Sequence, residues 1–295
     1  MPNIKYSIII PHYNTPDLLL RCLESIPEND CIQVIVVDDN SPRADEYKQL
    51  YPKLYRKNVE IYLTKEGRGA GYARNIGLRY AKGKWVLFAD ADDFYVKNFT
   101  ELLDENYNSD ADIIYFNIKS VMSNNINEPA NRNKAKDLLF EEYARTNDDS
   151  YFRCSYSEPW GKMIRHELIT NNNIKFDETK VDNDHYFSTV SGCLAKKIKA
   201  INKPIYVVTL RPGSLSFSFA ESIEKLLIRL EVETRVQLFE IEHGYNIKPM
   251  PIRGLMVLLL KKDLKLFIMH LFKIKNKGIP VIKLLWQIFN PKYMK

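Results

Sequence analysis

Short apolar segments alternate with segments of helical character through the first 117 residues. The apolar segments are rich in β-branched residues and predict strands at residues 6–10, 32–37, 59–63, 85–89 and 113–117. The segments between them predict helices at residues 18–26, 44–55, 70–81 and 96–107. Short, fully apolar strands separated by helices are typical of a mainly parallel sheet with helices on both faces, so the predicted fold class is α/β.

The residues that follow these strands are polar. The first predicted strand leads into Pro11-His12-Tyr13-Asn14, the second into Asp38-Asp39-Asn40-Ser41, and the fourth into Asp90-Ala91-Asp92-Asp93. A glycine cluster at residues 67–71 opens the predicted helix that carries Arg74. Because open α/β sheets bind ligands beyond the carboxyl ends of their strands, these residues are the candidates for chemistry.

The second half of the chain has weaker periodicity. Residues 120–136 are rich in Asn and Lys and predict a solvated excursion. Helices are predicted near residues 137–145 and 183–194 and at residues 221–241, and a strand is predicted at residues 205–209.

The composition is that of a globular protein. Apolar residues make up 45% and charged residues 27% of the 295 residues, which allows a packed core and excludes wholesale disorder. The four cysteines are far apart and form no C-x-x-C pair, which favours reduced thiols in the cytoplasm over a disulfide framework or a zinc site. The first residues do not resemble a signal peptide, and no apolar run approaches the roughly 18 residues that span a bilayer.

Basic charge is concentrated towards the C-terminal end. Residues 251–295 contain ten Lys and Arg and a single acid, Asp263, whereas residues 1–250 carry a net charge of −3. Apolar blocks alternate with lysines in this segment, and Trp286 and Tyr293 lie near its end. It can lie on an anionic membrane surface, which would make the protein peripheral on the inner face of the cell membrane, or it can pack as an amphipathic hairpin. No nucleic-acid-binding motif is present, so nucleic acid is not an expected partner.

The acidic cluster after the fourth strand is the sharpest local signal. Aspartates two apart at a strand end can direct oxygens at one hard cation, so Asp90 and Asp92 predict a Mg²⁺ or Mn²⁺ site. Such an ion can clamp a diphosphate and stabilise it as a leaving group. Asp93 can share in binding the ion or hold the diphosphate compound. A solvated acidic turn that caps the next helix is the alternative.

The acids after the second strand, Asp38 and Asp39, stand where a dinucleotide-binding fold contacts ribose. That fold needs glycines directly after the first strand, where this chain has Pro11 and Tyr13, so a Rossmann dehydrogenase is disfavoured. Tyr13 can instead stack on a nucleobase while Asp38 or Asp39 accepts from the base or ribose. A half-buried aromatic is the alternative role of Tyr13.

Taken together, these motifs resemble glycosyltransferase family 2, whose members have the GT-A fold. Four segments carry the resemblance in the order and spacing of the family: Ser7-Ile8-Ile9-Ile10-Pro11-His12-Tyr13-Asn14, Val36-Val37-Asp38-Asp39-Asn40-Ser41, Ala73-Arg74-Asn75-Ile76-Gly77 and Phe88-Ala89-Asp90-Ala91-Asp92-Asp93. The resemblance is strong to about residue 117, patchy to about 216 and absent beyond. It implies a catalytic domain at 1–217, with a nucleotide-sugar-binding half at 1–117 and an acceptor-binding half at 118–217. A C-terminal helical region at 218–295 follows, which we expect to associate with the membrane surface.

The second half of the chain contains weaker matches to the family. Trp160-Gly161-Lys162 resembles its W-x-K segment near the acceptor, and Asn183-Asp184-His185-Tyr186-Phe187 resembles the E-D-x-x-F start of a helix, whose Asp is the catalytic base. Asn183 replaces the usual Glu, so Asp182 is a possible substitute for Asp184. The segment that starts at Arg211 resembles a basic segment that closes over the diphosphate. Core packing for Trp160, helix capping for Asp184 and surface exposure for Arg74 and Arg211 are the plainer roles.

The resemblance implies an inverting transfer of a sugar from a nucleoside diphosphate, UDP by family tendency, to a hydroxyl of a glycan. The expected acceptor is a polyprenyl-diphosphate-linked oligosaccharide of a surface polysaccharide, such as lipopolysaccharide O-antigen or capsule. Asp184 is the expected base, Asp90 and Asp92 the expected ligands of Mn²⁺ or Mg²⁺, and Trp160 an acceptor contact. The expected donor contacts are Pro11, Tyr13, Asp38, Asp39, Arg74, Asp90, Asp93 and Arg211.

Two other function classes remain open from the sequence. A sugar nucleotidyltransferase also has paired acids on a nucleotide-binding sheet, but it would need a loop rich in glycine and arginine after the first strand, and none is present there. A catalytically silent, membrane-associated nucleotide-sugar-binding module is the other class. The intact acidic cluster and the carboxylate at Asp184 argue against it.

Overall fold

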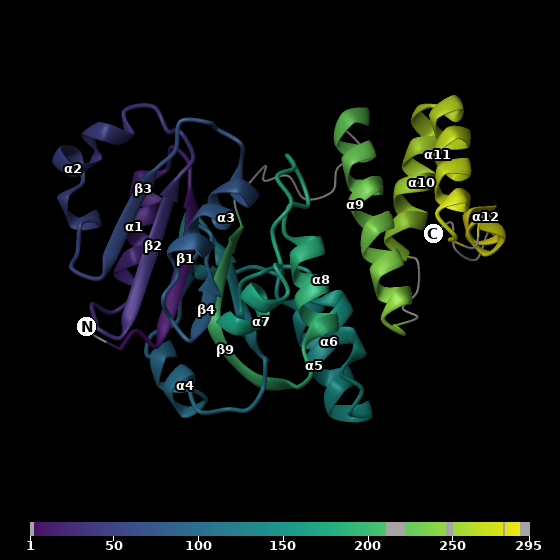
Figure 1. Ribbon diagram of the computed structural model, residues 1–295. Helices are drawn as coiled ribbons and strands as arrows, with labels where there is room; N and C mark the ends of the chain where they lie inside the picture. Colours follow the sequence, from purple (N-terminus) through teal and green to yellow (C-terminus); the bar gives the residue numbers. More distant parts are fainter. Residues whose placement is uncertain (1–2, 211–221, 246–249, 280, 290–295) are drawn as a thin grey trace.

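The computed structural model describes residues 3–210, 222–245, 250–279 and 281–289 (Figure 1). These residues form an α/β unit around one sheet, followed by a group of C-terminal helices. The strand order is β3-β2-β1-β4-β8-β6-β9-β5, with β7 paired to β6. The predicted α/β class and the helical C-terminal region are confirmed.

Four parallel strands form the first half of the sheet: β1 (Tyr6–His12), β2 (Ile32–Asp38), β3 (Val59–Leu63) and β4 (Trp85–Phe88). Every residue of β1, β2 and β4 is buried, as expected for strands covered on both faces. Figure 1 shows α3 (Ala70–Tyr80) in front of these strands and α1 (Pro16–Glu24) behind them. Because the strands are parallel, Tyr13, Asp39 and Asp90 follow them at the same edge of the sheet.

The second half of the sheet is mixed. Strand β8 (Lys162–Arg165) is antiparallel to β4 and to β6 (Ile113–Met122), and β9 (Ile198–Leu210) is parallel to β6. The short strands β5 (Phe94–Tyr95) and β7 (Asn125–Pro129) pair antiparallel with β9 and β6. The sheet as a whole is therefore less uniformly parallel than its first half.

Irregular pairing lets β9 reach the acidic turn. The register between β6 and β9 shifts on both sides of Asn117, and such irregularities bend and twist a strand. Beyond the shift, the Tyr206 hydroxyl oxygen accepts from the Asp90 N–H at 2.8 Å, and the Thr209 N–H donates to the Asp93 carboxylate at 2.7 Å. The turn after β4 is thus held by a strand from the other half of the sheet.

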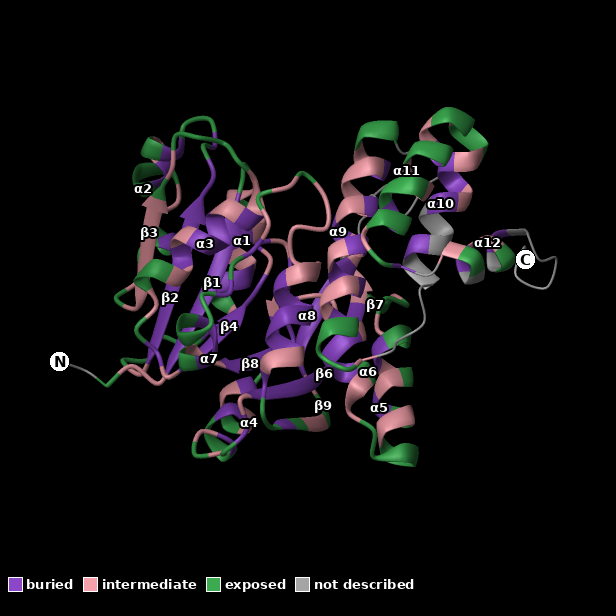
Figure 2. Cartoon of the chain, turned by 45° about the vertical axis from the view of Figure 1, so that its right-hand side comes forward, coloured by how far each residue is buried: buried purple, intermediate pink, exposed green. Residues whose placement is uncertain are grey.

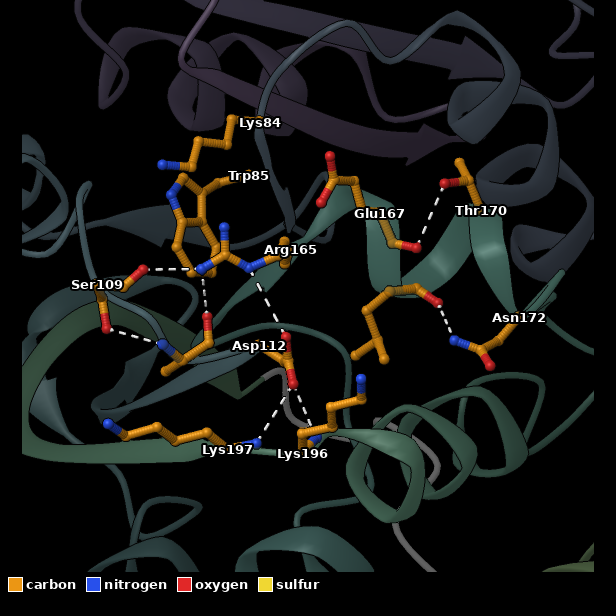
Figure 3. Close-up of polar contacts among 12 residues, drawn as sticks. Lys84, Trp85, Ser109, Asp112, Arg165, Glu167, Thr170, Asn172, Lys196 and Lys197 are labelled. Carbon is orange, nitrogen blue, oxygen red and sulfur yellow. Dashed lines mark hydrogen bonds and ion pairs between the residues drawn. The ribbon is translucent and has the colours of Figure 1, made fainter.

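A polar cluster at the opposite end of β4 fixes the antiparallel strand β8 (Figure 3). The Arg165 guanidinium lies 4.7 Å from the Trp85 ring centroid and donates to the carbonyl oxygens of Ser109 and Ala111 at 2.7 and 2.8 Å. The Asp112 carboxylate lies 3.7 Å from Arg165 Nε. Because these residues join β4, β6 and β8 away from the acidic turn, we infer that the cluster is structural.

Hydrophobic side chains form two cores. The larger core encloses the sheet, and the smaller one lies among the C-terminal helices (Figure 2). Helix α9 (Ile223–Glu242) takes part in both, because Leu226 and Leu230 belong to the smaller core and Phe239 packs against the larger one. Within the described ranges, no helix is long and apolar enough to cross a bilayer. The remaining α-helices of the described residues are α2 (Tyr47–Leu50), α4 (Phe99–Glu105), α5 (Lys134–Thr146), α6 (Ser150–Ser155), α7 (His166–Asn171), α8 (His185–Leu194), α10 (Met250–Lys262), α11 (Leu264–Asn276) and α12 (Val281–Phe289).

Two predicted elements are wrong in form. The helix predicted at residues 44–55 is a series of short turns, Ala44–Glu46, α2 and Pro52–Leu54, because Pro52 lacks the backbone donor that a continuous helix needs. The excursion predicted at residues 120–136 contains the end of β6 and all of β7. Every residue of β7 is exposed, so the polar composition of this segment belongs to a solvent-exposed strand and not to an irregular loop. The strand predicted at 205–209 is the apolar end of the longer β9.

Candidate functional site

Two cavities lie beyond the carboxyl ends of the parallel strands. The first has a volume of about 530 Å³ and is lined by Pro11, His12, Tyr13, Asp39, Asn40, Glu66, Gly67, Gly69 and Ala70. The second has a volume of about 450 Å³ and is lined by Pro11, Tyr13, Thr15, Ala70, Arg74, Asp90, Ala91, Asp92, Asn183 and Asp184. Because Pro11, Tyr13 and Ala70 line both, the cavities adjoin, and each is of a size typical for small-molecule sites.

Asp39 holds the glycine cluster against the first cavity. Its carboxylate accepts from the N–H groups of Arg68 and Gly69 at 3.1 and 2.5 Å. Gly69 has a φ of 92°, a conformation that residues with a β-carbon rarely adopt. Tyr13 lines both cavities and is 59% exposed, so its ring is accessible to a ligand. The predicted pair of Tyr13 and Asp39 is therefore brought together.

Asp38 lies behind the first cavity. It is buried, accepts from the Ser41 N–H at 2.7 Å and lies 2.7 Å from His12 Nδ1. His12 Nε2 accepts from the Thr15 N–H at 3.1 Å, so Nδ1 carries the proton and donates to Asp38. Burial raises the pKa of Asp38, but these hydrogen bonds outweigh it and leave the pKa below its usual value. Asp38 fixes the ends of β1 and β2 and is not brought into the cavity.

Asp90 and Asp92 line the second cavity together with Arg74. Arg74 is buried, and its Nη2 donates to Asp90 Oδ1 at 2.6 Å. The Asp92 carbonyl oxygen accepts from Arg21 Nη2 at 2.5 Å and from Thr209 Oγ1 at 2.8 Å. The backbone of the turn is thus anchored from α1 and β9 while two of its carboxylates line the cavity.

Asp93 is the exception among the three predicted acids. It is 3% exposed, is absent from the lining of both cavities and accepts from the Thr209 N–H. Burial, followed by the negative charges of Asp90 and Asp92, raises the pKa of Asp93 well above its usual value. The structure therefore places Asp93 as an anchor of the turn and does not bring it to the site expected for a donor contact.

The loop at residues 177–184 brings Asp184 into the second cavity at the N-terminus of α8. Burial raises the pKa of Asp184 to about 6, with the Arg74 charge opposing and Asp90 and Glu158 adding to the rise. A carboxylate with this pKa is ionised at neutral pH and can accept a proton. Asp182, the alternative base, pairs with Arg229 and does not line the cavity.

Trp160 and Lys162 are buried in the second half of the sheet. The Trp160 ring is 4% exposed and stacks on Tyr206 with a centroid distance of 5.7 Å. Lys162 Nζ donates to the Tyr156 carbonyl oxygen at 2.5 Å, and burial together with the Lys136 charge lowers its pKa to about 7. Trp160 is therefore not brought to an exposed acceptor surface. Arg211, the last predicted donor contact, and Tyr293 lie outside the described residues.

Several residues at the site were missed by sequence reasoning. Asn40 and Glu66 line the first cavity, and their position next to recognised motifs could have signalled them. Arg21, Tyr206 and Thr209 hold the acidic turn from other elements, and no motif marks them. Only the tertiary fold brings these three residues to the turn.

The carboxylates of the second cavity fit a hard divalent cation. Among the described residues, no group of three or more His, Cys, Asp or Glu side chains could hold a metal on its own. Mg²⁺ is commonly held by one or two carboxylates, with substrate phosphates and water completing its shell. Asp90 and Asp92, which line one cavity beside Arg74, provide such a partial set.

The model of the family described as "Glycosyl transferase family 2" matches residues 7–170. The matched range includes β1 from its second residue, all of β2 to β4, and the polar residues that follow each strand. The chain belongs to glycosyl transferase family 2. The family resemblance expected from the motifs is confirmed.

Curated relatives are bacterial glycosyltransferases. Glycosyltransferase GlyA of Streptococcus pneumoniae is 26% identical over 239 residues, which cover 74% of this chain and 32% of GlyA. The poly(ribitol-phosphate) β-N-acetylglucosaminyltransferase TarS of Staphylococcus aureus is 27% identical over 223 residues, which cover 71% of this chain and 36% of TarS. The chain thus spans about a third of the length of these two relatives.

Solved structures share the fold. The crystal structure of TarS 1–349 in complex with UDP-GlcNAc matches with a TM-score of 0.62 at 23% identity, covering 88% of this chain and 73% of that one. The mannosyltransferase PcManGT from Pyrobaculum calidifontis, in complex with GDP-Man and Mn²⁺, matches with a TM-score of 0.54 at 18% identity, covering 96% of this chain and 79% of that one. At these identities the likeness shows the fold, which is the GT-A fold expected from the sequence.

Proposed function

We propose that this family 2 member transfers a sugar from a nucleoside diphosphate, UDP in the first instance, to a hydroxyl of a glycan acceptor with inversion. One observation carries the proposal. Asp184 shares a single cavity with Arg74, Asp90 and Asp92, which places a carboxylate base and a set of diphosphate-holding groups around the same space. Sugar transfer needs a base for the acceptor hydroxyl and groups that stabilise the departing diphosphate, and both must lie near the reacting carbon.

The first cavity is the proposed nucleoside site. The accessible ring of Tyr13 stacks on the base, and Asp39, beside the glycine cluster, accepts from the base or ribose. The diphosphate then extends past Pro11 towards Arg74, because the two cavities share that wall. The structural neighbours TarS, in complex with UDP-GlcNAc, and PcManGT, in complex with GDP-Man, support a nucleotide-sugar donor.

Asp184 is the proposed general base. The acceptor oxygen attacks the anomeric carbon as its proton passes to Asp184, and the bond from that carbon to the diphosphate oxygen breaks with its electron pair. Positioned proton transfer of this kind contributes about a hundred- to ten-thousand-fold in rate. Attack from the side opposite the diphosphate inverts the anomeric configuration. Arg74 stabilises the charge that gathers on the diphosphate.

Asp92, together with Asp90, would hold Mn²⁺ or Mg²⁺. A bound cation would offset the negative charge of the departing diphosphate. Asp90 is already paired with Arg74 on one oxygen, which orients its carboxylate for this role.

The proposed acceptor is a hydroxyl of a bacterial surface polymer or of a polyprenyl-diphosphate-linked oligosaccharide such as an O-antigen or capsule precursor. Support comes from the relatives, since TarS is named for transfer to poly(ribitol-phosphate). A lipid-linked acceptor would also explain the C-terminal helices. Leu264, Ile268 and Phe272 recur every four residues on α11 and are 59, 44 and 59% exposed.

Those exposed side chains are the proposed contact with an anionic membrane surface. Exposed lysines flank them, at Lys261, Lys262, Lys265 and Lys275. Flotation of the full chain with anionic vesicles is expected, and substitution of Ile268 and Phe272 by Gln should abolish it. Removal of the whole segment is a poorer test because it exposes Leu226 and Leu230 of the smaller core. Equal flotation of the two proteins would remove this part of the proposal.

A panel of nucleotide sugars, screened by melting temperature with Mn²⁺ present, tests the function. A donor that binds the folded state stabilises it by about 2.7 kcal/mol at a hundred times its Kd. UDP-sugars should raise the melting temperature, and addition of a glycan acceptor should then release UDP. The Asp184→Asn variant should keep the melting shift and lose the release. If no nucleotide sugar shifts the melting temperature, the proposed function is wrong.

A further inference from the structure

Helix α9 lies beside α8, on the side away from the parallel strands, and continues into the C-terminal helices (Figure 1). By sequence it falls in the C-terminal region, outside the expected catalytic domain. In the structure, three charged side chains of α9 contact the 177–184 loop or the first residue of α8, which together surround Asp184.

The first contact lies two residues before the base. Arg229 Nη1 pairs with Asp182 Oδ1, and the two side chains are only 15% and 21% exposed. Asp182 has a φ of 51°, the left-handed region, which a residue with a β-carbon adopts at some cost. The ion pair therefore holds the backbone in a conformation from which Asn183 and Asp184 turn into the cavity.

The second contact lies one residue after the base. His185 Nδ1 is 2.9 Å from Glu233 Oε1, and the two side chains are 15% and 12% exposed. Burial lowers the pKa of His185, but the hydrogen bond and charge of Glu233 outweigh it and leave the pKa raised. Arg229 and Glu233 are four residues apart, so they extend from the same face of α9.

The third contact ties the first residue of the loop to α9. Arg235 Nη2 pairs with Asp177 Oδ2 while its guanidinium lies 4.5 Å from the Tyr186 ring centroid. The Asp177 N–H in turn donates to the Asn183 carbonyl oxygen at 3.0 Å. Both ends of the loop are thus tied to one helix.

A fourth pair joins the same two elements at the surface. Lys180 Nζ lies 2.8 Å from Glu224 Oε1, but these side chains are 71% and 65% exposed. Exposed ion pairs contribute little, whereas loss of one partner from a largely buried pair leaves a charge uncompensated. The chain therefore offers a matched control for the buried pairs.

We infer that α9 is a positioning element of the active site, in which Arg229 and Glu233 hold the backbone on either side of Asp184 so that its carboxylate stays aimed into the second cavity. The inference rests on the proposed function, because it takes Asp184 as the base. Arg229 and Glu233 act through the loop and touch neither the donor nor the reacting atoms. A misplacement of about 1 Å can reduce a rate by about a hundredfold, so modest loosening of the loop suffices.

The test compares Arg229→Met and Glu233→Gln with the control Glu224→Gln in the full chain. Hydrogen exchange of the amides at 177–186 reports the loop directly, without any turnover. UDP release from UDP-N-acetylglucosamine with Mn²⁺ and a glycan acceptor gives kcat, and calorimetry with the same nucleotide sugar gives its Kd. We expect Arg229→Met and Glu233→Gln to speed exchange and lower kcat, each about tenfold or more, with Kd changed less than about twofold. Glu224→Gln should match the wild type in all three.

Wild-type exchange and wild-type kcat in both test variants would overturn the inference, as would an equal loss in Glu224→Gln. If Arg229→Met does not fold, Asp182→Asn breaks the same pair from the loop side and should give the same pattern. The double variant Asp182→Asn/Glu233→Gln should exchange at least as fast as either single variant. Absence of UDP release from the wild type would count against the proposed function with this donor, while the exchange measurement would still decide whether α9 holds the loop.

Discussion

Arg74 Nη2 donates to Asp90 Oδ1 at 2.6 Å, and Nη1 of the same guanidinium donates to Asn183 Oδ1 at 2.8 Å. One buried side chain therefore ties the acidic turn after β4 to the residue next to Asp184. The planar fork of arginine can serve two acceptors in fixed directions, which a lysine ammonium on a flexible stem cannot. The two sides of the second cavity are set relative to each other through this guanidinium.

Arg74→Lys should lower kcat/KM about tenfold or more, because lysine keeps the charge but cannot span both acceptors. Its effect on the melting temperature should be smaller than that of Arg74→Ala, which leaves Asp90 without its partner. Steady-state kinetics and thermal melts measure the two effects. Arg79→Lys, an exposed position on the same helix, is the control and should change neither. Wild-type kcat/KM in Arg74→Lys would show that the bridge is dispensable.

The pH dependence of transfer should follow Asp184. Burial raises the pKa of this carboxyl to about 6, and only the ionised form can take a proton. The value of kcat/KM in the wild type should therefore rise with pH and level off above about pH 7. Rates measured across this range in a buffer series give the apparent pKa. A profile that stays flat down to about pH 5 would contradict the assignment of Asp184 as the base.

The same raised pKa predicts a change in stability. The pKa of Asp184 is about 6 in the folded state and 3.8 by its usual value, so between these two pH values the folded state binds more protons than the unfolded state. Ionisation of Asp184 therefore destabilises the folded state, and this loss of stability is complete above about pH 6. Asp184→Asn should therefore raise the melting temperature at pH above 7, and the gain should shrink as the pH falls towards 4. Thermal melts of both proteins at matched pH values check this. A gain that is independent of pH would point to a cause other than the charge.

The parallel half of the sheet could be predicted because each of its strands is a short, mainly apolar segment in which polar residues such as Ser7, Gln33 and Glu60 stand singly. The strand β9 was recognised only at its end, since residues before Pro204 are partly exposed and mix Lys and Asn with apolar residues. Its pairing with β6 is set by contacts across some 85 residues of sequence, which no local pattern encodes.

The candidate site also contains residues that local motifs could identify and residues that depend on tertiary structure. Motifs identified the cavity residues Tyr13 and Asp90 because polar residues at strand ends stand out locally, and Asp184 because its segment resembles the start of a helix in the family. Motifs could not separate Asp92 from Asp93, since the burial of Asp93 depends on where β9 ends. The helix α9 was assigned to a different region because its contacts with the loop depend on tertiary structure alone.

Removal of divalent cations should weaken donor binding. Asp90 and Asp92 lie in the cavity proposed for the diphosphate, and without a cation their charges repel it. Calorimetry with UDP-N-acetylglucosamine should give a Kd about tenfold or more higher in EDTA than in Mn²⁺, and Asp92→Asn should remove most of this difference. Equal affinity in EDTA and in Mn²⁺ would argue against a metal at these carboxylates.

Gly71 of α3 packs directly against the loop that carries Asp184. A β-carbon on Gly71 would come within 1.8 Å of the Asp177 carbonyl oxygen, a backbone atom that no side-chain rotation can move away. Gly71→Ala should therefore displace the loop, lower the free energy of unfolding by about 1–3 kcal/mol and reduce kcat. Denaturant unfolding and steady-state kinetics measure the two effects.

Gly77→Ala, on the same helix, is the matched control. Its β-carbon would come within 2.4 Å of Ile9 Cγ2 in β1, and the contacts it would make are with Ile9 and not with the loop. It should lower the free energy of unfolding by a similar amount while leaving kcat of the folded protein near the wild-type value, because the strain falls between α3 and β1. Equal losses of kcat in the two variants would mean that Gly71 affects the rate through general destabilisation. A loss confined to Gly71→Ala would connect the spacing between α3 and the loop to the orientation of Asp184.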